Sequence, residues 1–125
     1  MGRLSAKLRS IGGGDRHGIM HWCPGCDSPH AIWTSGPSPV WTYNGNPEAP
    51  TCNPSILVYT TEEDGKRTML CHYFIRKGSD IPRPDLNLDP NKSYIDFCGD
   101  SPHKFSGQLV ELPDWPYAEG EYGGA

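Results

Sequence analysis

The stretch His21-Trp22-Cys23-Pro24-Gly25-Cys26 is the part of the chain from which we predict the fold. Cys-Pro-Gly-Cys is a short turn that points two thiols in one direction, which is the geometry of half a tetrahedral zinc site. Two thiolates do not hold a metal ion alone, so the other ligands must come from farther along the chain. Two later clusters can supply them, Cys71-His72 and Cys98 with His103. The sequence therefore predicts a structural Zn²⁺ that ties an N-terminal turn to a C-terminal segment.

The preferred ligand set combines two thiolates with two imidazoles, a combination that structural zinc favours. It consists of Cys23, Cys26, His72 and His103. A strand projects adjacent residues to opposite faces, so Cys71 and His72 are not expected to bind the same ion. Cys71 is accordingly the first substitute for His72, and Cys98 is the first substitute for His103.

Two further residues are candidates for supporting the metal ligands through hydrogen bonds. Asp100 lies three residues before His103, where a carboxylate can accept the imidazole N–H and fix its tautomer. His30 flanks the Cys-Pro-Gly-Cys turn and can donate to a thiolate. Asp100 can equally cap its own turn, and His30 can equally be a structural histidine.

The composition indicates one small, loop-rich β domain. The chain has 125 residues, 35% of them hydrophobic, with 15 glycines and 13 prolines. Long helices are therefore unlikely and turns are many. We predict a mainly β fold, a small antiparallel sheet or sandwich with a zinc knuckle and long Pro/Gly-rich loops. A thin core of this kind typically needs a metal or disulfides to offset chain entropy.

Charge and cysteine content restrict the setting in which the protein acts. Five cysteines is an odd number, and no apolar segment follows the basic residues 1–7, so secretion and a disulfide framework are disfavoured. No apolar run is long enough to span a membrane. The net charge of −4 argues against general nucleic-acid binding, because neutralising phosphates needs a basic surface.

Three regions follow from the distribution of apolar and polar residues. We expect a flexible basic arm over residues 1–18, a single zinc-stapled β domain over 19–116, and a flexible tail over 117–125. Within the domain, alternating or apolar runs predict strands at 19–22, 31–34, 40–43, 55–60, 68–75, 94–98 and 108–113. The basic arm and the aromatic tail are the candidate partner-binding residues: Arg3, Lys7, Arg9, Trp115 and Tyr117.

Several motifs together resemble those of a family of small phage and prophage zinc-binding proteins. The resemblance covers roughly residues 19–116 and rests on Cys23-Pro24-Gly25-Cys26 with His30 and Ile32, Trp41-Thr42-Tyr43-Asn44-Gly45-Asn46, Pro50-Thr51 with Pro54-Ser55, Cys71-His72-Tyr73-Phe74-Ile75 with Gly78, and Asp100-x-x-His103-x-x-x-Gly107-Gln108 with Leu112-Pro113. Those proteins have no established activity and often carry the label ammonia monooxygenase. That label denotes a multi-subunit membrane enzyme, which does not agree with the missing transmembrane segment. Segment 79–93 is longer than in the family.

The absence of familiar catalytic motifs favours binding over catalysis. No His-Glu-x-x-His, His-x-Glu, phosphate loop or nucleophile elbow occurs in the sequence. The resemblance implies a phage-encoded zinc protein that acts in the virion or host cytoplasm. The thin core, the basic arm, the aromatic tail and the missing catalytic motifs favour a non-enzymatic role through protein contacts. The protein would be a capsid cement or other virion accessory protein, or an inhibitor of a host factor. The alternative is a small zinc-dependent hydrolase, which the surplus of Cys and His residues suggests.

Overall fold

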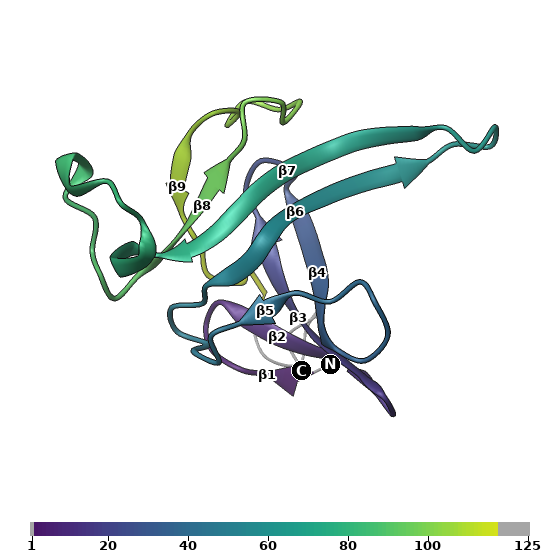
Figure 1. Cartoon of the computed structure of the whole chain (residues 1–125), viewed down its shortest axis with the longest axis horizontal. Coiled ribbons are helices and arrows are strands. Elements are labelled where there is room, and N and C mark those ends of the chain that lie inside the picture. Colours follow the sequence, from purple (N-terminus) through teal and green to yellow (C-terminus); the bar gives the residue numbers. More distant parts are fainter. Residues whose placement is uncertain (1, 118–125) are drawn as a thin grey trace.

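The computed structural model describes residues 2–117 and is mainly antiparallel β-structure, as the composition predicted (Figure 1). Two sheets are present, with strand order β1-β2-β3-β4 in the first and β5-β6-β7-β8-β9 in the second. The strands are β1 (Gly2–Arg3), β2 (Leu8–Gly13), β3 (Arg16–Cys23), β4 (Ser28–Ser35), β5 (Thr42–Tyr43), β6 (Cys52–Thr61), β7 (Arg67–Lys77), β8 (Ser93–Phe97) and β9 (Leu109–Glu111). Two 3₁₀ turns follow β7, η1 (Gly78–Asp80) and η2 (Pro84–Leu86).

Residues 2–18 contribute strands to the first sheet, whereas the sequence had suggested a flexible arm. β2 pairs antiparallel with β3 from Leu8 opposite His21 to Gly13 opposite Arg16. Arg9 is only 1% exposed. Its guanidinium donates to the carbonyl oxygens of Ser5 (2.8 Å) and Leu8 (3.0 Å). The buried cation is thus hydrogen-bonded as burial requires.

Two of the five candidate partner-binding residues, Arg9 and Trp115, lie against each other. The guanidinium of Arg9 lies over the Trp115 ring, 5.3 Å from its centre, and Trp115 is 5% exposed. Lys7 donates to the carbonyl of Leu112 and to the Asp114 carboxylate, each at 2.9 Å. Arg9 and Trp115 are therefore interior contacts rather than an open docking surface. Arg3 is exposed at the end of β1, Tyr117 contacts the Trp22 ring, and the rest of the expected tail, 118–125, lies outside the described residues.

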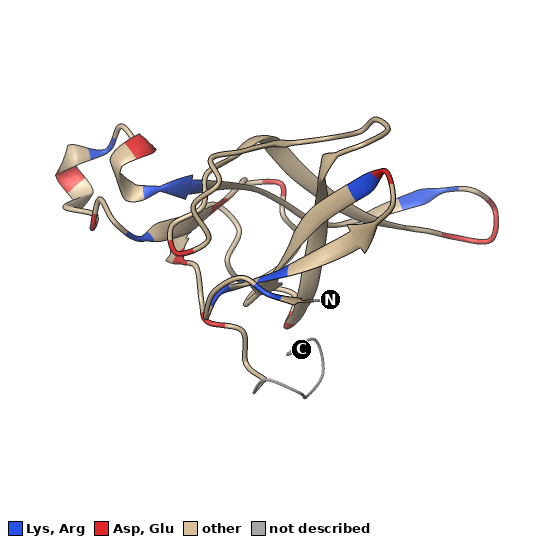
Figure 2. Cartoon of the chain, turned by 90° about the horizontal axis from the view of Figure 1, so that it is seen from below, with Lys and Arg blue, Asp and Glu red and all other residues tan. Residues whose placement is uncertain are grey.

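The second sheet is organised around the β6–β7 hairpin, which projects well beyond its neighbours (Figure 1). Its turn places Glu62, Glu63 and Asp64 at the tip, red at the far end in Figure 2. The sequence had predicted that this strand begins at residue 55. The structure instead starts the strand at Cys52 and absorbs the extra residues in a bulge between Cys52 and Ile56.

One core joins the two sheets. Its buried members come from both: Leu8, Ile19, Cys23, Ile32, Cys52, Ile56, Cys71, Tyr73, Ile75, Ile95, Phe97 and Leu112. On β7 the buried positions alternate with more exposed ones, as expected for a sheet with one face toward a core. Across residues 2–117, the helical segments are too short and too polar for any of them to cross a membrane.

Candidate metal centre and Ser-His-Asp site

Three thiols and one imidazole converge between the two sheets. The ligand atoms of Cys23, Cys26, Cys71 and His103 all lie within 4.8 Å of one another. Sγ of Cys71 is 4.0 Å from Sγ of Cys23 and 3.2 Å from Nε2 of His103. Three thiolates with one imidazole are a donor set of structural zinc sites, so these side chains can hold a metal ion. Cys71 occupies the place that we had preferred for His72.

Each ligand is delivered by a different local structure. Cys23 ends β3, Cys26 follows in the turn to β4, Cys71 lies in the middle of β7, and His103 lies in the loop between β8 and β9. Gly25 passes directly beneath the His103 ring, where a Cβ would collide with the ring atoms. The Cys-Pro-Gly-Cys turn therefore needs a glycine at that position.

The imidazole of His103 is held with one nitrogen toward the sulfur atoms. The backbone N–H of Phe105 lies 3.2 Å from Nδ1, which leaves Nε2 facing Cys71. The Phe97 ring supports the imidazole edge-on, with ring centres 4.7 Å apart.

The electrostatics of the three thiols favour a cation among them. Hydrogen bonding to Cys71 lowers the pKa of Cys23, and the same contact raises the pKa of Cys71. Burial, followed by the charge of Cys23, raises the pKa of Cys26 to about 11. Several neighbouring thiols cannot all ionise at neutral pH unless a positive charge compensates them, and a metal ion bound among them would supply that charge.

A buried polar network backs the metal centre. Tyr73 Oη lies 2.6 Å from Nε2 of His21 and 3.2 Å from Nδ1 of His30. His30 also lowers the pKa of the Cys23 thiol, after the larger effect of Cys71. Burial and the neighbouring His30 lower the pKa of His21 to about 4, so His21 is neutral near pH 7.

His72 lies on the other face of β7 and belongs to a different constellation. Its Nε2 is 3.1 Å from Oγ of Ser55, and its Nδ1 is 3.0 Å and 3.2 Å from the two carboxylate oxygens of Asp100. A carboxylate only accepts, so Nδ1 carries the proton and Nε2 is left to accept from the serine hydroxyl. Asp100 therefore fixes the tautomer of His72, whereas the sequence had suggested His103 as its partner.

The bulge at the start of β6 aims Ser55 at His72. From Cys52 to Ile56 the strand advances four residues, while the paired segment of β7 advances two, from Ile75 to Tyr73. Such a bulge redirects side chains and is frequent beside active sites. Trp41 also holds the backbone here, because its indole N–H donates to the carbonyl of Ser55 at 3.2 Å.

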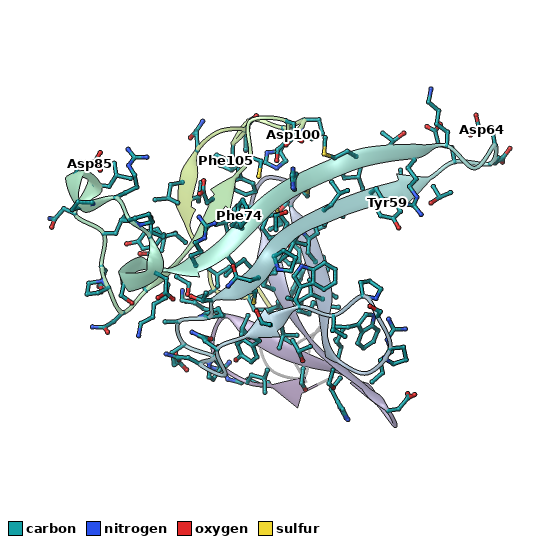
Figure 3. All side chains as sticks on the ribbon, in the orientation of Figure 1. Tyr59, Asp64, Phe74, Asp85, Asp100 and Phe105 are labelled. Atoms are coloured by element: carbon teal, nitrogen blue, oxygen red, sulfur yellow. The ribbon has the colours of Figure 1, made fainter. Side chains whose placement is uncertain are left out.

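Asp100 is positioned by the loop that follows β8. Ser101 brackets the backbone of His72, accepting from its N–H at 3.0 Å and donating to its carbonyl at 2.6 Å. The N–H of Cys98 donates to the same carbonyl at 2.9 Å. The loop carrying Asp100 is thereby fastened to β7, and Figure 3 shows Asp100 where this loop reaches over that strand.

The Ser-His-Asp site is open to solvent. The side chains are 27% exposed for His72 and 57% for Asp100. Leu57, which pairs directly with His72 across the two strands, is 48% exposed on the same face, and Leu70 is 43% exposed. Ser55 is itself partly exposed, so the hydrogen-bonded row lies at the surface of the sheet.

The fold and the site define a β domain that carries the side-chain set of serine hydrolases on one sheet face and a Cys/His cluster behind it. A family model described as bacterial ubiquitination-like system serine protease (BubE) matches residues 4–80. The chain belongs to this family. The matched range includes Ser55 and His72 and ends before Asp100. Neither the curated proteins nor the solved structures give a significant match.

The family overturns the function that we expected from the sequence. A non-enzymatic, phage-encoded capsid cement protein or host-factor inhibitor is wrong, because the family is that of a bacterial serine protease. The family match gives no support to the predicted location in a virion either. The sequence motifs did not single out Ser55, because it lies in a bulged strand and not in a nucleophile elbow.

Proposed function

We propose that this chain is a serine peptidase in which Ser55 is the nucleophile, His72 the general base and Asp100 the residue that orients the base. The observation that carries the proposal is the unbroken hydrogen-bonded row Ser55–His72–Asp100, with its short distances at both ends of the imidazole. Unrelated folds use the same three side chains in this order of contact, whatever their order along the chain.

The chemistry follows from the tautomer of His72. Nε2 accepts the Ser55 proton as Oγ bonds to the substrate carbonyl carbon, and it returns that proton to the leaving amine as the peptide bond breaks. The acyl group then stays on Ser55 until water, deprotonated by the same Nε2, displaces it. Asp100 stabilises the imidazolium that forms in each half of the reaction.

The substrate class that we propose combines the site and the family. The exposed Leu57 and Leu70 on the same sheet face provide apolar contacts for residues beside the scissile bond. The family description names a bacterial ubiquitination-like system, so the substrate would be a protein of such a system, cleaved in an extended segment.

We further propose that the Cys/His cluster holds a structural Zn²⁺. Its four ligands come from both sheets and leave no open coordination position, which is characteristic of structural rather than catalytic zinc. When bound, the ion would cross-link the β3–β4 turn to β7 and to the β8–β9 loop. It would therefore stabilise the strand that carries His72.

Hydrolysis of unstructured peptides by matched variants tests the peptidase proposal. We expect Ser55→Ala to lower kcat/KM by at least about 10⁴-fold, because the nucleophile is lost. Ser79→Ala is the control, since Ser79 is exposed in η1 and outside the site. Equal activity of the Ser55→Ala variant and the parent would refute the assignment.

A further inference from the structure

Cys98 is a thiol beside the Ser-His-Asp site that the proposed reaction does not use. The ligand atoms of His72, Cys98 and Asp100 all lie within 4.8 Å of one another. We propose that these three side chains form a second, weaker zinc site whose occupation switches the peptidase off. The regulatory half of this inference rests on the proposed function, and the binding half does not.

The donor set fits a borderline-soft divalent cation. A thiolate, an imidazole nitrogen and a carboxylate oxygen are all zinc ligands, and the two anionic groups would balance the charge of Zn²⁺. Three protein ligands leave one coordination position for water. The centre at Cys23, Cys26, Cys71 and His103 offers four ligands and three sulfur atoms. Zinc should therefore fill that centre first and the second site only in excess.

The local structure keeps the three ligands together. The N–H of Cys98 donates to the carbonyl of His72, which continues the β7–β8 pairing past Phe97. The Ser101 hydroxyl anchors the next part of the loop to the N–H and the carbonyl of the same residue, His72. Contacts with the His72 backbone thus hold both Cys98 and the loop that carries Asp100 against β7.

Zinc at this site would remove the general base directly. Binding releases the thiol proton of Cys98 and uses a lone pair of the His72 ring. If zinc takes Nδ1, the ring proton moves to Nε2, which then has no lone pair for the Ser55 proton. If zinc takes Nε2, that lone pair is occupied by the metal. In the first case the Asp100 carboxylate would lose the Nδ1–H as its partner and would be free to bind the ion.

The test is a zinc titration of the purified full chain, followed by native mass spectrometry and by peptide hydrolysis. The parent protein should bind one Zn²⁺ and then a second in excess, and its activity should fall as the second ion binds. Cys98→Ser should keep the basal activity, bind only one ion, and need at least about ten-fold more Zn²⁺ for half inhibition. Asp96→Asn is the matched control, because Asp96 lies on β8 two residues earlier but outside the cluster.

The two proposals fail in different ways. If Cys98→Ser binds the second ion and is inhibited like the parent, or if the parent never binds a second ion, the second site is refuted. If Asp96→Asn loses zinc sensitivity as fully as Cys98→Ser, the effect is one of charge rather than ligation, and the site is again refuted. If Ser55→Ala matches the parent in hydrolysis, the peptidase is refuted, while the count of bound ions still decides the second site.

Discussion

Cys71 and His72 are adjacent on β7 but serve opposite faces of the sheet. Sγ of Cys71 lies 3.2 Å from Nε2 of His103 in the metal cluster, whereas Nε2 of His72 lies 3.1 Å from Oγ of Ser55. The alternation of side chains along a strand separates the two environments. One strand therefore links the stability of the domain to the position of its proposed general base.

This relationship predicts opposite outcomes for substitutions one residue apart. Cys71→Ala should lose stoichiometric zinc and melt at a lower temperature, because one of four ligands is gone and metal binding contributes to folding. His72→Ala should keep one zinc per chain and the parent melting temperature, but lose peptidase activity. Elemental analysis and thermal unfolding measure both. The reverse pattern, with zinc lost from His72→Ala and kept by Cys71→Ala, would restore His72 as the metal ligand.

Asp100→Asn should damage turnover far more than stability. An amide at this position can donate to Nδ1 and so select the wrong tautomer of His72, which costs about 10⁴-fold in kcat at comparable sites. KM should change little, because Asp100 acts through the imidazole. The control is Asp85→Asn, an exposed carboxylate on η2, far from Asp100 in Figure 3. An unchanged kcat for Asp100→Asn, with the fold intact, would remove Asp100 from the mechanism.

The packing of the two chain ends predicts a large difference between neighbouring substitutions. Trp115 is 5% exposed against Arg9 and Trp22, so Trp115→Ala should cost about 3–5 kcal/mol of unfolding free energy. Asp114→Ala breaks only the exposed ion pair with Lys7 and should cost less than about 1 kcal/mol. Denaturant unfolding compares them. Similar small costs for both would mean that this end of the chain does not support the core.

The β class and much of the metal cluster follow from the sequence, because their signals are local. The apolar runs on either side of the Cys-Pro-Gly-Cys turn predicted the two strands of the β3–β4 hairpin. Strand alternation predicted that Cys71 and His72 would not share an ion. The sequence could not show which of the two joins the metal cluster, because that depends on which face of β7 packs against the first sheet.

The Ser-His-Asp site depends on non-local geometry. Ser55 and Asp100 are separated from His72 by 17 and 28 residues, and their meeting requires the β6 bulge and the loop after β8. The one local signal was Asn53-Pro54-Ser55, where a proline interrupts an otherwise strong strand pattern. The strands over residues 2–13 were missed for a different reason. An arginine in a basic segment suggests a solvent-exposed charge, and the sequence does not reveal the backbone carbonyl groups that accept its hydrogen bonds in the interior.

The most direct measurement is covalent labelling of the zinc-loaded chain with a fluorophosphonate, followed by mass analysis of the intact protein and its peptides. An activated serine displaces fluoride and keeps the phosphonyl group, so the reagent reports the nucleophile without knowledge of the substrate. We predict one adduct per chain, located on Ser55, and none on the Ser55→Ala variant. A folded, zinc-loaded chain that takes up no label, or that is labelled equally with and without Ser55, would contradict the assignment of Ser55, His72 and Asp100 as a catalytic triad.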